Sequence, residues 1–599
     1  MEKHTVQNQL ITLALLLALF GLFVFGLNWL HLRPDEELVY VHTSGSLPHT
    51  IWYQARQDVQ APLWHSFFWG WRRLAGDSEL AGRYQGVLWS MLTLALLYRV
   101  MRRWFGAARY GWFAMVSVSI SAYFFTYAFE VRPYPVLLLA STLCMWTFSR
   151  WQCNPTWRRT LYYGASLALL AYIHYFLVYL VLVQVIYWLA NRPPRAHYWR
   201  FAAATGIALV LWSPWIHTFF YQVNFLRQID GGSLGIASTT TDTSWPVIRR
   251  LLERATNGNI LMFAGVLAVG AWRVRRREYA LLLLWALAVP VIALTLNTLA
   301  NVYDERYIVY LSVGLSSAVG VAVASLPGRM VRWPAIAVLA GMILWNLPGH
   351  LPNRIQYRTV MERVSTNALP GDAILFDNAE EGSGLVQWNM GMYLPEELLA
   401  NRVPDVEAAR GYRRVWYVSG NLVQNGVQER FWELERTHPL VMVTGRCVAD
   451  GCYIAQLVET SPNPEPLAVF AAPPERTSDN LPFYGVDVES VTDHMVDMRL
   501  WWMLEQPAIL DYSVSVRLTD EAGAVVAQSD GPPVSRDGNL LNTSQLEAER
   551  MTVDYRTLDT SALEPGEYDL QIVVYQPVDG YNLLVGDSEQ LFLRTIIIP

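Results

Sequence analysis

The feature that most constrains the fold is a series of long apolar intervals without charge in the first part of the chain. The first interval, 5–30, has no charged residue, and at about 1.5 Å per residue it is long enough to cross a bilayer core of roughly 30 Å. Of the 599 residues, 53% are hydrophobic and 16% are charged, and the apolar character lies within 10–348. Soluble proteins carry about 25% charged residues, so the sequence predicts a polytopic α-helical membrane domain followed by water-soluble domains.

The charge-free intervals and the positions of the arginines predict about eleven membrane spans. Nine intervals predict one crossing each: 5–30, 86–98, 110–129, 133–149, 201–226, 255–272, 279–303, 307–328 and 333–353. The remaining interval, 160–191, is too long for one crossing and short for two. Arginine clusters precede and follow it, and such clusters mark the cytoplasmic side, so we expect it to cross twice and turn near His174. This topology predicts a protein that crosses the cell membrane several times, with its N-terminus in the cytoplasm and its C-terminal domains outside.

In this topology the outward loops gather ionisable residues at one edge of the membrane. Asp35, Glu36 and Glu37 follow the first span, and the same loop holds an amphipathic stretch at 51–56 that could lie along the interface. The outward loops also contribute Arg83, Glu130, Arg132, His174, Tyr175, Arg306 and Tyr307. Charges at a membrane edge are costly and are therefore often functional, although the acidic residues could equally begin an ordinary polar loop.

Five segments occur in an order that resembles a known family. They are Pro34-Asp35-Glu36-Glu37, Ala61-Pro62-Leu63-Trp64-His65, Phe129-Glu130-Val131-Arg132-Pro133-Tyr134, Tyr172-Ile173-His174-Tyr175-Phe176 and Glu305-Arg306-Tyr307. Together they resemble the motifs of the GT-C superfamily of glycosyltransferases, and most closely those of its protein O-mannosyltransferase and aminoarabinose-transferase branch. Glu305 stands where the family has proline. The resemblance covers roughly residues 8–350, and the order and shared outward placement of the motifs are more specific than any single motif.

The resemblance implies a GT-C-like fold and an enzyme that moves a hexosyl or pentosyl group from a polyprenyl-phosphate sugar to an acceptor hydroxyl on a protein, lipid or glycan. The departing phosphate needs positive charge and the acceptor hydroxyl needs a carboxylate to take its proton, which suits a single inverting displacement. By resemblance, Asp35 is the catalytic base and Glu36 is a second catalytic or positioning acid. Arg306 is the first candidate for the donor phosphate, because a guanidinium can bind phosphate with two hydrogen bonds.

Other residues of the outward loops have more than one interpretation. An arginine at a helix end often anchors to lipid head groups instead of binding substrate, Glu130 could simply pair with Arg132, and His174 could cap the hairpin. The further candidates for the donor-phosphate site are Tyr307, Arg132 and Arg83, and those for substrate contacts are Glu130, His174 and Tyr175.

Cofactors and other partners are less constrained. The sequence requires no cofactor, and a divalent metal is possible because His31, His42 and His49 lie near the acidic residues, although their spacing matches no familiar ligand set. The net charge of −6 argues against nucleic acid as a partner. The alternative function is a polytopic transporter or flippase of lipid-linked or anionic substrates. Such a protein would show paired repeats or broken helices near the bilayer midplane, and the sequence has no evident repeat.

Beyond the membrane domain, assigned to 1–352, the sequence predicts two soluble domains. Strand and helix patterns in 353–460 predict a small extracytoplasmic α/β domain, and 461–480, rich in Pro, Ser and Glu, predicts a linker. Alternating strands in 481–599 predict an Ig-like β-sandwich of about seven strands. Cys447 and Cys452 flank a predicted hairpin tip in an exported domain, where oxidation is permitted, so we expect a structural disulfide between them.

Overall fold

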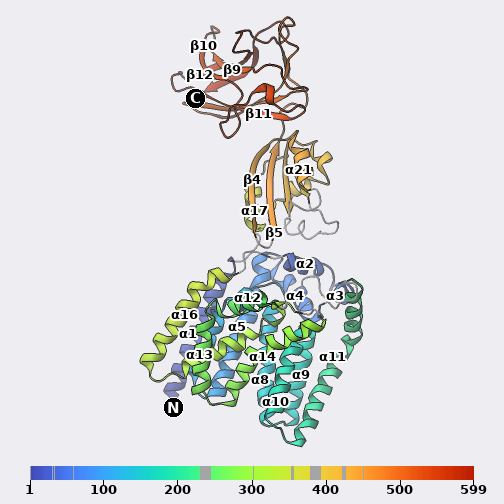
Figure 1. The fold of residues 1–599 in the computed structure, drawn as a ribbon, viewed down its shortest axis with the longest axis vertical. Helices are drawn as coiled ribbons and strands as arrows, with labels where there is room; N and C mark the ends of the chain where they lie inside the picture. The colour runs from blue at the N-terminus through green and yellow to red at the C-terminus, as the bar shows by residue number, and fades with distance from the viewer. Residues whose placement is uncertain are drawn as a thin grey trace. The chain divides into compact units, whose positions relative to one another are not determined.

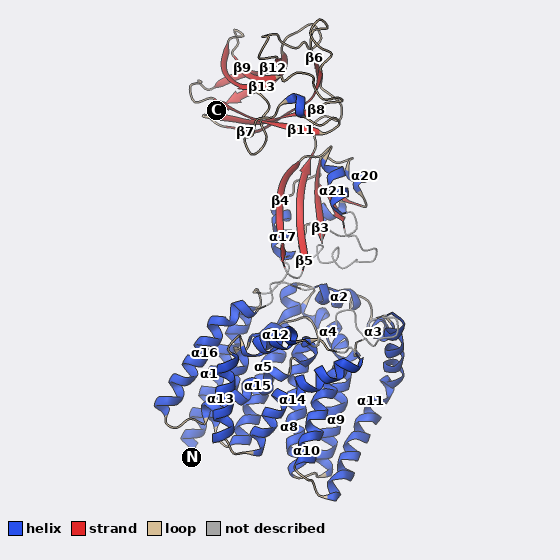
Figure 2. Cartoon of the chain, in the orientation of Figure 1, coloured by secondary structure: helices blue, strands red, loops and turns tan. Residues whose placement is uncertain are grey.

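The computed structural model describes residues 2–29, 32, 34–57, 60–229, 244–300, 303–351, 357–377, 393–420, 427–448 and 451–599. The chain divides into two compact units, Met1–Arg354 and Ile355–Pro599, and each is described by itself. Figure 1 labels their helices and strands, and Figure 2 shows that unit 1 is helical whereas the strands belong to unit 2.

Unit 1 is a bundle of long helices, with α2, α3, α4 and α12 at the end away from the N-terminus (Figure 1). Most of the bundle is formed by α1 (Glu2–Gly26), α5 (Glu79–Phe105), α6 (Ala108–Ser119), α8 (Tyr134–Cys153), α9 (Trp157–Ile173), α10 (Val178–Ala190), α11 (Arg195–Ile229), α13 (Ile260–Arg273), α14 (Arg277–Ala300), α15 (Leu311–Ala324) and α16 (Arg329–His350). The other helices are α2 (Pro34–His42), α3 (Leu47–Arg56), α4 (Pro62–Ala75), α7 (Ala122–Ala128), α12 (Trp245–Thr256) and the 3₁₀ turns η1 (Tyr175–Leu177) and η2 (Glu305–Ile308).

A helix lies at each of the predicted crossings, and the apolar helices make this a multi-pass membrane unit. Among the described residues, four helices are long and apolar enough to cross a membrane by length and composition alone, namely α1, α11, α14 and α16, and the number rises to as many as six if each of two bent pairs is one span. Helices α10 and α15 are apolar but shorter. The count of eleven spans therefore stays a prediction, whereas the turn expected near His174 lies between α9 and η1.

The two bent pairs meet at one buried side chain, which the sequence patterns did not single out. Helices α6 and α7 meet at 73°, and α12 and α13 meet at 67°. Asn257, buried between α12 and α13, accepts a hydrogen bond from the backbone N–H of Ala122 at 2.8 Å and donates to the carbonyl of Ile120 at 3.2 Å. It also donates to the carbonyl of Ile343 in α16. Since a helix break leaves backbone groups unpaired, the side chain of Asn257, placed at the break between α12 and α13, stabilises the break between α6 and α7.

The α/β part of unit 2 is a five-stranded mixed sheet. Its strands, in the order β2-β1-β3-β5-β4, are β1 (Ala373–Asp377), β2 (Arg402–Val403), β3 (Arg414–Gly420), β4 (Leu440–Val448) and β5 (Gly451–Glu459). Its described helices are α17 (Tyr357–Asn367), α19 (Glu396–Ala400), α20 (Val406–Ala409) and α21 (Val427–Glu435). β1 pairs in parallel with β2 and β3, whereas β5 pairs antiparallel with β3 and β4. Every residue of β1 is buried, as expected for a parallel strand covered on both faces.

The predicted disulfide lies where β4 and β5 form a hairpin. The backbone register pairs Cys447 directly with Cys452, in agreement with the hairpin expected from the sequence. Their side chains lie outside the described residues, so the disulfide stays a prediction. The other two cysteines, Cys144 and Cys153, are free.

The C-terminal part of unit 2 consists of two four-stranded antiparallel sheets that share one core. One sheet has the order β11-β8-β7-β6 and the other β10-β9-β12-β13. The strands are β6 (Ala468–Ala471), β7 (Asn480–Val491), β8 (Met495–Met503), β9 (Ser513–Thr519), β10 (Val525–Gly531), β11 (Met551–Asp559), β12 (Gly566–Tyr575) and β13 (Leu591–Ile598). Phe470 and Trp502 from the first sheet pack in the same cluster as Val516 and Ile572 from the second. The segment 461–480, expected to be a linker, therefore contributes β6 to this core.

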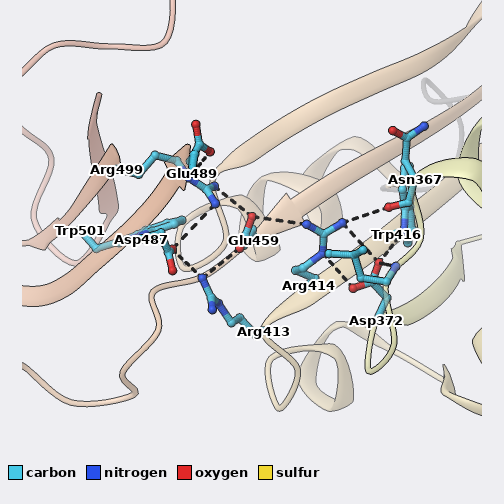
Figure 3. A network of polar contacts seen from close by, with 11 residues as sticks. Asn367, Asp372, Arg413, Arg414, Trp416, Glu459, Asp487, Glu489, Arg499 and Trp501 are labelled. Atoms are coloured by element: carbon cyan, nitrogen blue, oxygen red, sulfur yellow. Dashed lines mark hydrogen bonds and ion pairs between the residues drawn. The ribbon is translucent and has the colours of Figure 1, made fainter. Parts of the chain in front are cut away.

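A network of ion pairs joins the two parts of unit 2 (Figure 3). Glu459, at the end of β5, is buried, and it accepts from Arg499 of β8 at 2.9 Å and from Arg413, beside β3, at 3.1 Å. Arg413 also pairs with Asp487 of β7 at 2.5 Å. The guanidinium of Arg414 continues the network to Asp372, before β1. Glu459 and Arg499 are buried, and each of them faces an opposite charge, so their charges are compensated.

Candidate active site

A cavity of about 330 Å³ lies among helix ends and connecting segments of unit 1. It is lined by Asp35, Leu38 and His42 of α2, Tyr53 and Gln57 near the end of α3, Gln60 and Ala61 before α4, Arg132, Pro133 and Tyr134 at the start of α8, and Ile173, His174, Tyr175, Phe176, Arg306 and Tyr307 from the end of α9, η1 and η2. All five motif segments of the sequence analysis thus meet here. Three of them contribute several residues each, and the other two contribute Asp35 and Ala61.

The cavity contains one partly exposed carboxylate in contact with a guanidinium. Helix α2 begins at Pro34 with three acidic residues in its first turn, which favours helix initiation because the helix N-terminus attracts negative charge. The Asp35 side chain is 39% exposed and accepts a hydrogen bond from Nη1 of Arg306, whose own side chain is 10% exposed. The predicted base and the predicted phosphate-binding residue are therefore paired with each other.

Arg306 is held by a second carboxylate that the sequence analysis did not assign to the site. Its Nε and Nη2 donate to Oδ2 of Asp304 at 2.9 and 2.8 Å, and its backbone N–H donates to Oδ1 of Asp304. Asp304 caps η2, so the same side chain both begins the turn and orients the guanidinium. The sequence feature that could have indicated Asp304 is its position two residues before Arg306 in an outward loop.

Arg132 supplies a second guanidinium to the cavity wall. Its Nη1 donates to the backbone carbonyl of Asp35 at 3.1 Å. The amide oxygen of Gln60, in the orientation that satisfies its neighbours, accepts from Nη1 and Nη2 at 3.2 and 2.7 Å. These two contacts hold the guanidinium of Arg132 at the cavity wall, and a guanidinium can donate to the oxygens of an anion.

The wall opposite these charges is aromatic. Phe176 and Tyr307 stack with ring centroids 4.6 Å apart, and the ring of His174 lies 5.1 Å from that of Tyr307. Burial, and then the guanidiniums of Arg132 and Arg306, lower the pKa of His174 to about 3. The imidazole is therefore neutral at physiological pH and contributes a polar ring instead of a third positive charge.

Hydrogen bonds of the Tyr175 hydroxyl connect the cavity lining to α11. This hydroxyl donates to the amide oxygen of Gln222 at 2.7 Å and accepts from the indole N–H of Trp215 at 2.8 Å. Gln222 in turn donates to the carbonyls of Gln54 and Gln60. This set of hydrogen bonds ties η1, α11 and the segment around α3 together at the cavity.

Three predicted site residues lie outside the cavity lining. Glu36 is fully buried and accepts from the backbone N–H of Val131 at 2.8 Å. Arg83 donates to the carbonyl of Leu27 at 3.0 Å and lies 3.3 Å from Glu79 and 3.9 Å from Glu36. Glu130 is also buried. Glu36 and Arg83 therefore contact other parts of the protein and not the cavity. The hydrogen bond from Val131 to Glu36 holds the segment that carries Arg132.

Comparisons with known proteins agree with this geometry. Residues 59–217 match the family model described as dolichyl-phosphate-mannose-protein mannosyltransferase. The fold is similar to that of ArnT from Cupriavidus metallidurans in the apo state, with a TM-score of 0.50 and 14% sequence identity over 76% of this chain and 98% of that chain. The chain therefore contains a segment that matches this mannosyltransferase family model, and it has a fold similar to that of ArnT.

Two further solved structures resemble this chain at lower scores. One is ArnT from the same organism bound to undecaprenyl phosphate, with a TM-score of 0.49 and 14% identity over 74% of this chain and 97% of that chain. The other is the arabinosyltransferase EmbB from Mycobacterium smegmatis, with a TM-score of 0.34 and 10% identity over 96% of this chain and 64% of that chain. No curated protein matches the sequence.

A buried acid, Glu37, lies on α2 close to the cavity. Glu37 is inaccessible to solvent, and neither of its carboxyl oxygens has a hydrogen-bond partner among the described residues. Burial, followed by the charges of Glu36, Asp35 and Glu79, raises the pKa of Glu37 well above its ordinary value. The protonated form is favoured, because an unpaired buried carboxylate is costly.

The acidic residues do not assemble a metal site in the part of the chain that the structure describes. No group of three or more His, Cys, Asp or Glu side chains there is arranged to hold a metal ion. His42 lines the cavity with its ring 4.0 Å from that of Tyr53, and His49 lies near Trp52. His31 lies outside the described residues.

Proposed function

We propose that this protein transfers a sugar from a polyprenyl-phosphate donor to an acceptor hydroxyl, at the outer face of the membrane. The observation that carries the proposal is a cavity in which two guanidiniums, of Arg132 and Arg306, lie beside the partly exposed carboxylate of Asp35. The description of the matching family names a dolichyl-phosphate-linked sugar and a mannosyltransferase reaction. Dolichyl phosphate is a polyprenyl-type lipid phosphate, which is the donor class that such a cationic pocket would bind.

The donor phosphate would lie between the two guanidiniums. Arg132 donates to the carbonyl of Asp35 and to the amide oxygen of Gln60, and Arg306 is oriented by Asp304. Both can donate to phosphate oxygens, and their charge would stabilise the phosphate further as the bond to the sugar breaks. The stacked rings of Phe176 and Tyr307 offer an apolar wall of the kind that lines small-molecule sites.

Binding of the donor would release the base. Without the donor, Asp35 is paired with Arg306, so the carboxylate already holds a hydrogen-bond donor. An anionic phosphate competes with Asp35 for the same guanidinium. The freed carboxylate can then accept the proton of an acceptor hydroxyl.

The chemical step is a single displacement. The acceptor oxygen forms a bond to the anomeric carbon as its proton passes to Asp35, and the bond from that carbon to the phosphate oxygen breaks. The polyprenyl phosphate leaves with the electron pair, and the configuration at the anomeric carbon inverts. Protein, lipid and glycan hydroxyls are all acceptors of the required chemistry.

The test uses the purified full chain in lipid nanodiscs. Polyprenyl-phosphate sugars are supplied with membrane extract as the source of acceptors, and release of polyprenyl phosphate and transfer of labelled sugar are measured by mass spectrometry. We expect transfer with at least one donor sugar and its loss in Asp35→Asn, with Asp77→Asn, an exposed residue of the same loop paired with Arg72, as the matched control. If donors bind but no sugar is released by the wild-type protein, the transferase assignment is wrong and the transporter or flippase function takes its place.

A further inference from the structure

A second groove, of about 620 Å³, lies on helices α8 and α9, which pack side by side (Figure 1). The cavity described above meets α8 at its first residue, Tyr134, and α9 at its last, Ile173. The groove instead meets α8 at Arg150, near its end, and α9 at Arg158, near its start. From Tyr134 to Arg150, α8 rises about 24 Å. The groove is therefore near the membrane face opposite to the cavity.

The groove is strongly and uniformly positive. Arg150, Arg158 and Arg159 line it, and Arg99 and Arg103 lie close enough to repel the guanidinium of Arg150 as well. In the described part of the chain, none of these five arginines forms an ion pair with a carboxylate. The sequence offers little to neutralise them, because the only acidic residue between 99 and 200 is Glu130, which precedes the opposite end of α8.

The groove changes from charged to apolar along the two helices. Leu143, before Arg150 in α8, and Leu169, after Arg159 in α9, lie nearer the middle of the two helices than the arginines and line the apolar part. Trp146 lies between the two regions, with the guanidiniums of Arg150 and Arg99 over its ring at 5.4 and 6.0 Å. Its buried indole N–H has no acceptor among the described residues. A ligand with an anionic head and an apolar chain would match this gradient.

We infer that this groove binds an anionic glycerophospholipid, with its phosphate at Arg150, Arg158 and Arg159 and an acyl chain along Leu143 and Leu169. Arginine forks bind phosphate with two hydrogen bonds, and basic pockets between membrane helices are suited to lipid head groups. Inorganic phosphate would leave the apolar walls uncovered. A zwitterionic lipid would bring its ammonium group among guanidiniums, with no carboxylate nearby to receive it. The inference is independent of the proposed transferase activity, because it concerns the opposite membrane leaflet.

The first experiment needs no variant. The full chain is purified in detergent and titrated with phosphatidylglycerol or phosphatidylcholine of identical acyl chains, and retained lipid and thermal unfolding are followed by native mass spectrometry and scanning calorimetry. We expect phosphatidylglycerol to be retained at least tenfold more tightly and to raise the unfolding temperature, since a ligand of the folded state stabilises it. Equal retention of the two lipids would overturn the inference.

Variants then locate the site. The double variant Arg150→Gln and Arg158→Gln should abolish the preference for phosphatidylglycerol. The control double variant, Arg329→Gln and Arg332→Gln at the start of α16, removes the same amount of charge elsewhere and should keep the preference. Arg159 is left unchanged because it donates to the carbonyls of Arg150 and Asn154 and so supports the turn. Equal losses in the two double variants would assign the preference to overall charge and overturn the site.

Two further ligands distinguish other occupants. Inorganic phosphate at millimolar concentration should neither raise the unfolding temperature by the same amount nor displace the lipid. If it does both, the occupant is a free phosphate. Polyprenyl phosphate could instead be retained at this groove in place of phosphatidylglycerol. If that retention is lost in the Arg150 and Arg158 double variant, the occupant is the polyprenyl lipid carrier and not a phospholipid.

Discussion

Asp35 pairs with Arg306 across the chain, and this single contact links the base to the donor site. Asp35→Asn should keep the fold and donor binding but lower turnover by about 10²- to 10⁴-fold, because an amide cannot accept the hydroxyl proton. Turnover and donor affinity measured separately on the same preparation check this. Near wild-type turnover would remove Asp35 as the base and make Asp304, the other carboxylate on Arg306, the next candidate.

Arg306 should behave differently from Asp35 because it would contact the phosphate before and during the reaction. Loss of a hydrogen bond to a charged group costs about 1.5–3 kcal/mol, so Arg306→Ala should weaken donor binding roughly 10- to 100-fold and lower turnover too. Arg306→Lys should recover only part, since lysine lacks the planar fork. Arg249→Ala, in an exposed pair with Glu253, is the control. Unchanged donor affinity in Arg306→Ala would remove Arg306 from the phosphate site.

Glu37 gives a prediction for stability against pH. Its pKa in the folded protein is raised above the unfolded value, so its contribution to stability is present below about pH 4.5 and is lost as the pH rises through the folded pKa. Gln resembles the protonated acid, so Glu37→Gln should unfold at a higher temperature than wild type at pH 8 and at the same temperature at pH 4. Thermal unfolding in detergent at both pH values measures this, with Glu253→Gln as a control. A variant destabilised at pH 8 would show that the carboxylate is the form the fold needs.

At the scale of elements, the sequence predicted the positions of the long helices because charge-free intervals have few alternative structures in a membrane. It could not predict the breaks between α6 and α7 or between α12 and α13, since these depend on the contacts of Asn257 with distant backbone groups. The sequence analysis also assigned Asp35 and Glu36 to the same catalytic site. On helix α2 successive residues point about 100° apart, so Asp35 lies in the cavity and Glu36 accepts from Val131 below it.

The packing of α5 against the segment that carries Arg132 can be tested at one glycine. A Cβ on Gly86 would lie 2.6 Å from the carbonyl oxygen of Ala128 and 3.1 Å from Cα of Phe129, both backbone atoms. Gly86→Ala should therefore cost about 1–3 kcal/mol of stability and weaken donor binding by moving Arg132. Gly341→Ala in α16, where a Cβ meets nothing within 4 Å, should be neutral or slightly stabilising. Thermal unfolding and donor titration of both variants measure these effects. Equal stability of the two variants would mean that α5 can shift to make room for the added Cβ.

For the whole molecule, the sequence predicted a helical membrane unit followed by α/β and β-rich parts because composition and strand periodicity change sharply along the chain. The strand β6 was missed because it has only four residues between proline-rich segments, and its pairing with β7 depends on residues further along the chain. The charges at Glu459 were also missed, since Arg413 lies beside the five-stranded sheet whereas Asp487 and Arg499 lie on the sheet of β7 and β8, and only the packing of these two sheets brings them together.

The orientation of unit 1 in the membrane decides what the site can act on. The arginine clusters predict that reporter fusions after Arg103, Arg195 and Arg276 remain in the cytoplasm and that fusions at Asp77 and Gly371 are exported. Enzymatic reporters active on only one side of the membrane measure this directly. A cytoplasmic Asp77 would turn the cavity inward, because Asp77 directly precedes α5 in the same loop as Asp35. The acceptor hydroxyl would then be cytoplasmic, and the groove at Arg150 would meet the outer leaflet.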